Sequence, residues 1–316
     1  MKKIRIYPLE RSPFYRLSNR AKLANLLTIK PQDLSKLSGD RLYNTFQKNT
    51  GNKLRDIQEP IGLRDRVHAQ IQKLISRIET PEHLFSGKKR LSPLDNAKYH
   101  LQNHYFLSTD IENFFPSCKR EYIFRFFHYQ IKMSEDIAWL MTDIICYDDH
   151  VPTGSHLSQS VAYWAYSNTF DQIDKLAREQ DLKFSLYVDD MTFSGAAPIP
   201  RNLHLSIGYK LKRVGLKLKR RKTRYYSKKQ FKKVTGATIS PTNELLITNR
   251  HRKKLKEIKD RYDDMTKMSP KTVRSFLGTL RYMRQIQSDY YQQPYIILKP
   301  IEQELNRSLA DQSKLR

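Results

Sequence analysis

The stretch that decides the fold is residues 184–195, which read Phe184-Ser185-Leu186-Tyr187-Val188-Asp189-Asp190-Met191-Thr192-Phe193-Ser194-Gly195. Apolar and polar side chains alternate on both sides of the aspartate pair, which is typical of two β-strands. The pair therefore falls at the tip of an expected hairpin, where repulsion and loss of solvent raise carboxyl pKa values unless a cation neutralises them. A divalent ion such as Mg2+, which favours oxygen ligands, fits that position. The alternative is an ordinary solvated Asp-Asp turn.

A further carboxylate, Asp110, ends a second alternating segment at residues 104–111. If this strand lies beside the hairpin, Asp110, Asp189 and Asp190 converge on one point. Three carboxylates form a two-metal site that suits in-line attack of a hydroxyl on phosphorus. One ion activates the attacking oxygen and the other stabilises charge on a pyrophosphate leaving group. Taken alone, Asp110 is also consistent with a simple strand-end or capping aspartate.

Basic residues strongly outnumber acidic ones, with 58 Lys and Arg against 32 Asp and Glu and a formal net charge of +26. Residues 210–233 hold thirteen Lys or Arg and no acid, interleaved with Tyr225, Tyr226 and Phe231, and residues 250–256 form a second basic stretch. Such density predicts a nucleic-acid partner, because phosphates release counterions on binding and aromatic rings stack on bases. An anionic membrane is the competing partner. The sequence shows no apolar run of about 18 residues, no signal peptide and no lipidation motif, so no membrane association is expected.

The composition is that of a globular protein, with 39% hydrophobic and 11% aromatic residues. Its 316 residues suffice for one large domain or two or three closely packed subdomains. Cys118 and Cys146 lie in apolar surroundings without metal-ligand spacing, so we expect reduced packing residues of a cytoplasmic protein.

The order of expected elements indicates an α+β fold, in which helices cover one face of a small mixed or antiparallel sheet. Besides the strands above, short strands are expected at 216–218, 234–240 and 245–247. A helix capped by Ser117 is expected to carry Ile123 and Phe124. Further helices are expected at residues 20–27, 31–37, 40–47, 65–78, 157–179 and 203–214, with a mostly helical and basic chain after residue 248.

At the aspartates the sequence resembles the reverse transcriptase family. Residues 108–117 (STDIENFFPS) resemble motif A of that family, and residues 187–190 (YVDD) resemble motif C. The other blocks follow in the family's order: Lys53 and Arg55 resemble basic residues of the fingers, 152–155 with Ser158 resemble motif B, and 215–216 with 222–223 resemble motif D. The resemblance covers about residues 50 to 250, and the ordered set is highly specific.

Two further motifs resemble the retron branch of this family. Residues 96–100 (NAKYH) match the NAxxH signature before motif A, and residues 234–236 match the VTG signature after motif D. Asn96 and His100 invite a catalytic reading, but no nucleophile or metal spacing accompanies them. For these two residues, contact with the retron RNA and structural support are equal alternatives.

The resemblance implies a role for each matching residue. Asp110, Asp189 and Asp190, assisted by the backbone carbonyl of Ile111, would hold two Mg2+ ions. Phe115 would be the steric gate that rejects a 2′-hydroxyl on the incoming dNTP, with core packing beside Phe114 as its alternative. The implied nucleotide-binding residues are Lys53, Arg55, Phe115, Thr153, Gly154 and Lys222, of which Lys222 could steady the pyrophosphate. The candidate RNA-binding residues are Asn96, His100, Arg220, Arg221, Arg250, Arg252, Lys253 and Lys254.

The sequence departs from the family in motif B. Many relatives have Gln where Thr153 stands, and a Ser-Pro pair where Ser158 and Gln159 stand. A glutamine-type contact to the nucleotide is therefore in doubt. The catalytic carboxylates are intact, so activity is expected.

The resemblance implies a right-hand polymerase with an antiparallel palm sheet and a helical thumb. Fingers are expected at 1–106 and 117–160, palm at 107–116 and 161–247, and an RNA-binding thumb at 248–316. The expected function is synthesis of DNA on a cognate noncoding RNA from a 2′-hydroxyl primer, giving branched multicopy single-stranded DNA for antiphage defence with an effector protein. Another bacterial reverse transcriptase, group II-like or diversity-generating, is the nearest alternative. A noncatalytic RNA-binding scaffold is the alternative from a different class.

Overall fold

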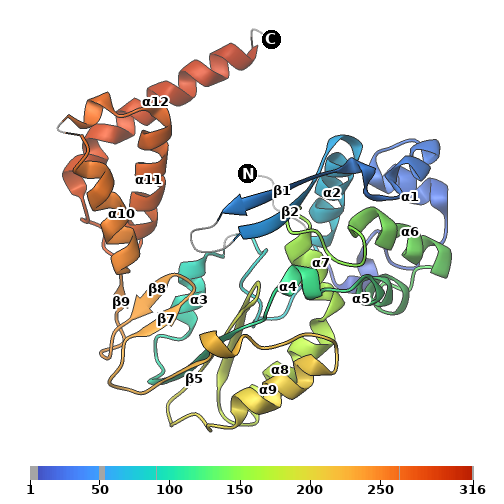
Figure 1. Cartoon of the computed structure of the whole chain (residues 1–316), viewed down its shortest axis with the longest axis horizontal. Coiled ribbons are helices and arrows are strands. Elements are labelled where there is room, and N and C mark those ends of the chain that lie inside the picture. The colour runs from blue at the N-terminus through green and yellow to red at the C-terminus, as the bar shows by residue number, and fades with distance from the viewer. Residues whose placement is uncertain (1–5, 50–53, 90, 263, 315–316) are drawn as a thin grey trace. The chain divides into compact units, whose positions relative to one another are not determined.

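The structure is a computed structural model that describes residues 6–49, 54–89, 91–262 and 264–314 (Figure 1). The chain divides into two compact units. The first unit comprises Met1–Asn96 and Asn103–Ser227, and the second comprises Ala97–Gln102 and Lys228–Arg316. Helix α3 (Pro93–Tyr99) contains the point where the chain passes from one unit to the other.

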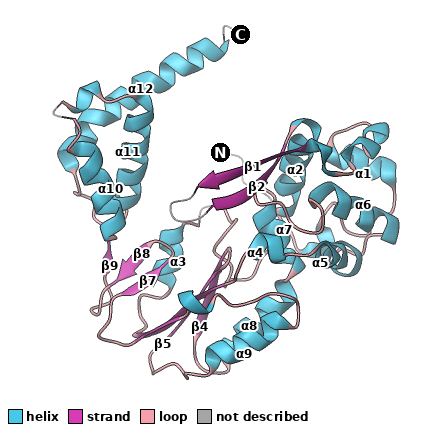
Figure 2. Ribbon diagram, in the orientation of Figure 1, coloured by secondary structure: helices cyan, strands magenta, loops and turns pink. Residues whose placement is uncertain are grey.

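The first unit contains a four-stranded antiparallel sheet with the order β4-β5-β3-β6 (Figure 2). Its strands are β3 (Tyr105–Asp110), β4 (Lys183–Tyr187), β5 (Asp190–Gly195) and β6 (Arg224–Tyr226). β3 pairs with β5 so that Tyr105 lies opposite Gly195 and Asp110 lies opposite Asp190. The expected hairpin and its expected neighbour strand are therefore both present.

Both faces of this sheet are covered. Ser185 and Leu186, which point to opposite faces of β4, are both buried, and the Phe184 and Phe193 rings stack with centroids 4.8 Å apart. Helix α8 (Ser167–Arg178) packs against β4 and helix α9 (Leu203–Lys212) packs against α8, as Figure 1 shows. The longer helices of the first unit are α1 (Arg20–Leu27), α2 (Gly62–Ile75), α6 (Glu135–Ile145), α7 (Ser158–Ala165), α8 (Ser167–Arg178) and α9 (Leu203–Lys212). The shorter ones are α4 (Phe114–Ser117), α5 (Arg120–Arg125), a π-helix (Phe126–Gln130) and 3-10 turns at Leu9–Arg11, Pro31–Asp33, Ser35–Leu37, Asp40–Leu42 and Arg220–Lys222.

Three local predictions were wrong. Residues 43–47, expected to be helical, belong to β1 (Tyr43–Asn49), which pairs with β2 (Leu54–Pro60) in an antiparallel ribbon. At these residues, pairing with β2 determines the secondary structure, although the local spacing of apolar residues is helical. Ser117 ends α4 and caps no helix, because α5 has Lys119 at its N-cap. The expected helix 157–179 is interrupted at Tyr166, which has φ −115° and whose hydroxyl accepts the Lys119 N–H at 3.1 Å.

The second unit has its own small sheet and its own core. Strands β7 (Lys232–Val234), β8 (Ala237–Ile239) and β9 (Leu245–Leu246) are antiparallel, so the strand expected at 234–240 is broken by a turn. Helices α10 (Asn249–Lys259), α11 (Pro270–Arg284) and α12 (Gln292–Lys314) follow, with a 3-10 turn at Met265–Lys267. The core residues are Ile247, Leu255, Met268, Val273, Phe276, Leu277, Leu280, Met283 and Leu298.

The compact units are groupings by contact, and the expected palm and thumb boundary at residue 248 stays a prediction. The chain divides at Ser227, so the strands at 232–246 group with the C-terminal helices rather than with the four-stranded sheet. Of the strand expected at 216–218, Leu218 makes an isolated antiparallel bridge with Ile111. Within the described residues, no helix is long and apolar enough to cross a membrane.

Candidate metal and catalytic site

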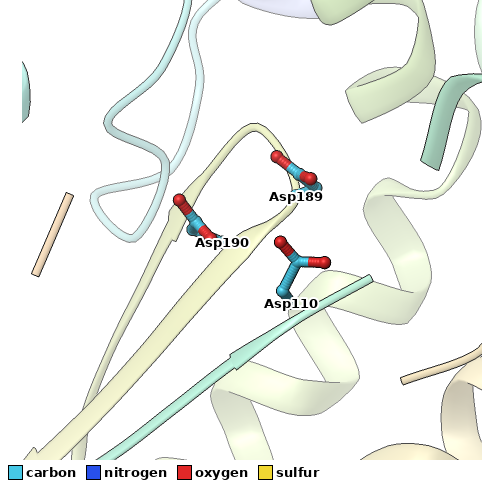
Figure 3. Close-up of side chains that lie close together, drawn as sticks. All are labelled: Asp110, Asp189 and Asp190. Carbon is cyan, nitrogen blue, oxygen red and sulfur yellow. The ribbon is translucent and has the colours of Figure 1, made fainter. Parts of the chain in front are cut away.

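Three aspartates meet at one end of the four-stranded sheet (Figure 3). Asp110 is the last residue of β3, Asp190 is the first residue of β5, and Asp189 lies in the turn between β4 and β5. One carboxylate oxygen from each lies within 4.8 Å of those from the other two. The convergence expected from the sequence is therefore present.

Backbone contacts fix this arrangement. The Ile111 N–H donates to the Asp189 carbonyl at 3.0 Å, and the Lys219 N–H donates to the Asp110 carbonyl at 2.7 Å. Val188, the residue before the pair, has φ +60°. A β-branched residue adopts this left-handed conformation only where surrounding contacts impose it. The turn that presents Asp189 is thus held by its neighbours.

Both carboxyl groups of the hairpin are shifted toward the protonated form. Burial, together with the nearby charge of Asp110, raises the pKa of Asp189 above its ordinary value. Burial and the charge of Asp189 raise the pKa of Asp190 to about 6. These are the shifts expected of clustered carboxylates that lack sufficient compensating positive charge.

Two lysines supply part of that charge. Lys222 Nζ donates a hydrogen bond to Asp110 Oδ2, and Lys219 Nζ lies 3.7 Å from Asp110 Oδ1. Burial lowers the pKa of Lys222, but the hydrogen bond and the three carboxylates outweigh burial and raise it. Lys222 therefore contacts a catalytic candidate directly, while its expected contact with a nucleotide stays a prediction.

The residues present fit a divalent metal. Asp110 Oδ1 is buried and has no hydrogen-bond partner among the described residues, which leaves a ligand oxygen available. Three hard carboxylates at this spacing are the donor set that Mg2+ prefers. Asp110, Asp189 and Asp190 could hold the metal, and Ile111 lies immediately beyond Asp110 with its side chain fully buried.

A pocket of about 580 Å³ opens beside the aspartates and collects several expected nucleotide-binding residues. Arg55 from β2, Phe115 from α4 and Thr153 line it together with Asp189 and Lys219. The remaining lining residues are Leu54, Asp56, Gln58, Ile111, Asn113, Phe114, Pro116, His150 and Val188. Lys53 lies outside the described residues.

Phe114 and Phe115 have different surroundings. Phe114 is 5% exposed and its ring lies 6.3 Å from that of Phe170 in the core. Phe115 is only partly buried and lines the pocket. The Phe115 ring also lies against that of Phe114, with centroids 5.6 Å apart, so the steric gate and the packing residue both stay predictions for Phe115.

The loop that resembles motif B is clamped to β2. The Thr153 N–H donates to Gln58 Oε1 at 3.0 Å and the Gly154 N–H donates to the Gln58 carbonyl at 3.1 Å. A Cβ at residue 154 would lie 2.7 Å from that carbonyl oxygen, so only glycine allows the approach. Gly154 thus has a structural reason beside its expected nucleotide role. The Thr153 hydroxyl is buried without a hydrogen-bond partner among the described residues.

The candidate RNA-binding residues are in two different settings. Arg220 and Arg221, in the first unit, and Arg250, Arg252, Lys253 and Lys254, on α10, are exposed. Arg250, Lys253 and Lys254 line a pocket of about 620 Å³ in which Glu257 is the single acid. Asn96 and His100 are 1% and 0% exposed, which favours structural support over RNA contact for their side chains.

The VTG motif forms a tight turn. Val234 pairs with Ala237, and the two residues between them have positive φ angles of 41° at Thr235 and 85° at Gly236. Two left-handed residues in a two-residue hairpin are the geometry of a type I′ turn, which favours glycine. Residues 97–102 of the NAxxH region belong to the same compact unit as this turn.

Sequence reasoning missed three residues. Lys219 lies beside Asp110, but it stands among many lysines and arginines. Its register is set by backbone contacts that the sequence does not reveal: the bridge between Ile111 and Leu218 and the bond of its own N–H to the Asp110 carbonyl. Gln58 accepts the Thr153 N–H of the motif B loop, a contact made between residues that are far apart in the sequence. Ser86, which accepts the Val188 N–H at 2.9 Å, is 102 residues away in sequence.

Comparisons of the whole sequence with known proteins find retron reverse transcriptases. No family model matches the sequence. The chain is 23% identical over 279 residues to the retron Ec86 reverse transcriptase of Escherichia coli, covering 87% of this chain and 85% of that protein. It is 25% identical over 155 residues to the retron Se72 reverse transcriptase of Salmonella heidelberg (strain 579083-10), covering 48% of this chain and 41% of that protein. It is 26% identical over 174 residues to the retron Ec83 reverse transcriptase of Escherichia coli, covering 51% and 55%.

Among solved structures, telomerase from Candida albicans in complex with a fragment of telomeric RNA has a TM-score of 0.50 at 11% identity, covering 84% of this chain and 56% of that chain. This likeness concerns the fold, and the antiparallel sheet with helices around it is that of a right-hand polymerase. The solved structures thus show the fold of a right-hand polymerase, and the class of enzyme comes from the similarity in sequence. The sequence similarity, which extends over 87% of the chain for the Ec86 enzyme, supports a retron-type reverse transcriptase, an RNA-directed DNA polymerase.

Proposed function

We propose that the chain copies part of a cognate noncoding RNA into DNA, starting from an RNA 2′-hydroxyl and producing branched multicopy single-stranded DNA. The observation that carries the catalytic part is the convergence of Asp110, Asp189 and Asp190 beside a pocket of about 580 Å³. The retron part rests on the similarity to the retron enzymes. In this proposal the product serves antiphage defence with an effector protein in the bacterial cytoplasm.

The three aspartates would hold two Mg2+ ions, with the Ile111 carbonyl as a further ligand. When bound, the ions supply activation of the attacking hydroxyl and neutralisation of charge on the pyrophosphate. The chain's own part is alignment. The pairing of β3 with β5 fixes Asp110 against Asp190, and Lys222 holds the Asp110 carboxylate by a hydrogen bond.

The pocket beside the aspartates would bind the incoming dNTP. Arg55, with Lys53, would neutralise the triphosphate, and Lys222 could steady the departing pyrophosphate. The Phe115 ring would lie against the sugar, where a 2′-hydroxyl has no room. Thr153 and Gly154 would form the pocket wall that the clamp to Gln58 keeps in place.

The exposed basic residues would grip the RNA. A-form RNA is recognised mainly through shape, phosphates and 2′-hydroxyls, which a basic helical surface suits. Arg250, Arg252, Lys253 and Lys254 on α10 supply that surface, and Arg220 and Arg221 supply a second one. Asn96 and His100 would support the fold that presents the RNA-binding residues.

The test is DNA synthesis by the full chain purified with its copurifying RNA, given dNTPs and Mg2+. Wild type is expected to extend DNA and Asp189→Asn to be inactive. Asp181→Asn is the matched control, because Asp181 is exposed and left-handed (φ 54°), a conformation that Asn accepts. Undiminished synthesis by Asp189→Asn would contradict the catalytic assignment.

The retron assignment has a separate readout. Sequencing the copurified nucleic acid, before and after treatment with a debranching enzyme, is expected to reveal a 2′-5′ linkage between RNA and DNA. A product extended only from an ordinary 3′-hydroxyl would contradict the retron part and leave the polymerase assignment intact.

A further inference from the structure

Residues 83–86 run alongside the outer strand of the catalytic hairpin. The Leu186 N–H donates to the His83 carbonyl at 2.8 Å, and the Phe85 N–H donates to the Leu186 carbonyl at 3.0 Å. Leu84 and Leu186 form a parallel bridge. This segment therefore continues the sheet beyond β4, on the side away from β5.

Ser86, the last residue of the segment, reaches the hairpin turn itself. Its Oγ accepts the Val188 N–H at 2.9 Å, and the side chain is 3% exposed. Val188 is the residue with the unfavourable φ of +60°, and Asp189 follows it directly. A serine hydroxyl thus meets the backbone at the strained point of the turn, one residue before a metal-ligand candidate.

We propose that Ser86 is a positioning residue for the polymerase reaction: its hydroxyl holds the left-handed turn at Val188 and thereby fixes Asp189 and Asp190 for metal binding. The inference rests on the catalytic role of these aspartates proposed above. Without the acceptor, the Val188 N–H loses its partner and the β-branched residue relaxes toward negative φ, because left-handed backbone is costly for it. A change of φ at residue 188 displaces Asp189. A displacement of about 1 Å at a reacting centre lowers rates about a hundredfold, and the Ile111 N–H, which still holds the Asp189 carbonyl, keeps the displacement smaller than that.

The surroundings of Ser86 make it a rigid support. Lys88 Nζ donates to the Pro81 carbonyl at 2.6 Å, which closes the loop that carries the segment. Ser86 also lines a pocket of about 390 Å³ with Tyr163 and Trp164. Threonine keeps the hydroxyl and adds one methyl group, which we expect this pocket to accommodate.

The experiment compares Ser86→Ala, Ser86→Thr and Ser167→Ala in the full chain with its RNA. Ser167 is the matched control: it is 4% exposed and its hydroxyl donates to the Trp164 carbonyl at 3.0 Å, away from the hairpin. Measurements are kcat and KM for a single dNTP, the Mg2+ concentration for half-maximal rate, and the melting temperature. Asp189→Asn is included to test the underlying assignment.

Ser86→Ala is expected to lower kcat about tenfold, which corresponds to about 1.4 kcal/mol, with KM for dNTP changed by less than about twofold. Its half-maximal Mg2+ concentration is expected to rise. Ser86→Thr is expected to have the wild-type kcat and the wild-type half-maximal Mg2+ concentration. Ser167→Ala is expected to keep both wild-type values, although its melting temperature falls as much as that of Ser86→Ala.

Wild-type kcat and Mg2+ dependence in Ser86→Ala would overturn the proposal. So would a loss of kcat that Ser86→Thr shares and that follows the melting temperature, since the hydroxyl would then serve only the fold. Activity retained by Asp189→Asn would instead overturn the proposed catalytic site, so the two failures are distinguishable.

Discussion

Asp110 and Asp190 are register partners on adjacent antiparallel strands. Their spacing is therefore set by the backbone hydrogen bonds between β3 and β5. The Ile111 N–H donates to the Asp189 carbonyl at 3.0 Å, so the position of Asp189 is fixed by the same two strands. A slip of one residue would turn Asp110 to the opposite face of the sheet. The geometry of the candidate metal site is thus a property of the sheet.

Asp110→Asn is expected to lower DNA synthesis by at least about a hundredfold, because the amide keeps the shape and loses the charge that binds a metal and pairs with Lys222. Single-nucleotide extension with and without excess Mg2+ measures it. The Asp181→Asn control is expected to match wild type. An Asp110→Asn protein that extends primers within tenfold of wild type would show that this carboxylate is dispensable.

Phe115→Ala is expected to reduce discrimination against ribonucleotides about a hundredfold, because the pocket loses the ring that we propose lies against the sugar. The ratio of kcat/KM for dNTP to that for rNTP measures this effect, with dNTP incorporation itself as the internal reference. An unchanged ratio would assign Phe115 to packing against Phe114.

The strands and the aspartate cluster could be predicted because their information is local. Period-2 alternation marks β3, β4 and β5, and each carboxylate stands where its strand meets a turn. Which strands are neighbours is not local, so convergence stayed conditional until the pairing of Asp110 with Asp190 was observed.

The missed features depend on tertiary pairing. β1 became a strand through its ladder with β2, although its sequence has helical spacing. Lys219 is one of thirteen basic residues between 210 and 233, and nothing in the run distinguishes it. Ser86 meets Val188 only because residues 83–86 lie along β4. No pattern within a short window carries these contacts.

Gly154→Ala is expected to destabilise the first unit by about 1–3 kcal/mol and to weaken dNTP binding, because the new Cβ would lie 2.7 Å from the Gln58 carbonyl oxygen. Urea unfolding and KM for dNTP measure the two effects. The control is Gly278→Ala in α11, where a Cβ meets nothing within 4 Å and alanine is expected to add up to about 1 kcal/mol. Equal stabilities of the two variants would contradict the clamp.

His68 is expected to make stability fall in mild acid. Its Nε2 lies 2.8 Å from the Ile144 carbonyl, so it carries the hydrogen, and Nδ1 accepts the Ser155 hydroxyl at 2.8 Å. Burial, aided by the charge of Arg64, lowers the pKa of His68 to about 4. Because this value lies below that of the unfolded chain, the stabilisation is complete above about pH 6.5 and is lost as the pH falls toward 4.

Between pH 7 and pH 5 this loss amounts to about 2 kcal/mol. His68→Gln keeps a donor for the Ile144 carbonyl without a titrating group, so its free energy of unfolding is expected to fall by about 2 kcal/mol less over that range. His83, whose pKa burial also lowers to about 4, titrates in both proteins and cancels from the difference. If the free energies of unfolding of wild type and His68→Gln changed equally with pH, the pKa of His68 would not be lowered in the folded protein.

The basic pocket on α10 is expected to contact RNA phosphates. Lys254→Gln and Arg250→Gln, made singly, are each expected to weaken binding of the cognate RNA and to reduce the slope of log affinity against log salt by about one. The physical reason is that each cation that neutralises a phosphate releases one counterion. RNA binding measured from low to physiological salt gives the slope.

Lys175→Gln is the matched control, because Lys175 is an exposed lysine on α8 whose loss changes the net charge equally. Its salt slope is expected to stay at the wild-type value, since a change in net charge alone alters the long-range field and not the number of phosphates in contact. If Lys254→Gln and Lys175→Gln lower the slope by the same amount, the pocket on α10 makes no specific phosphate contact. If Lys254→Gln alone lowers it while melting normally, the pocket is a site where RNA is held.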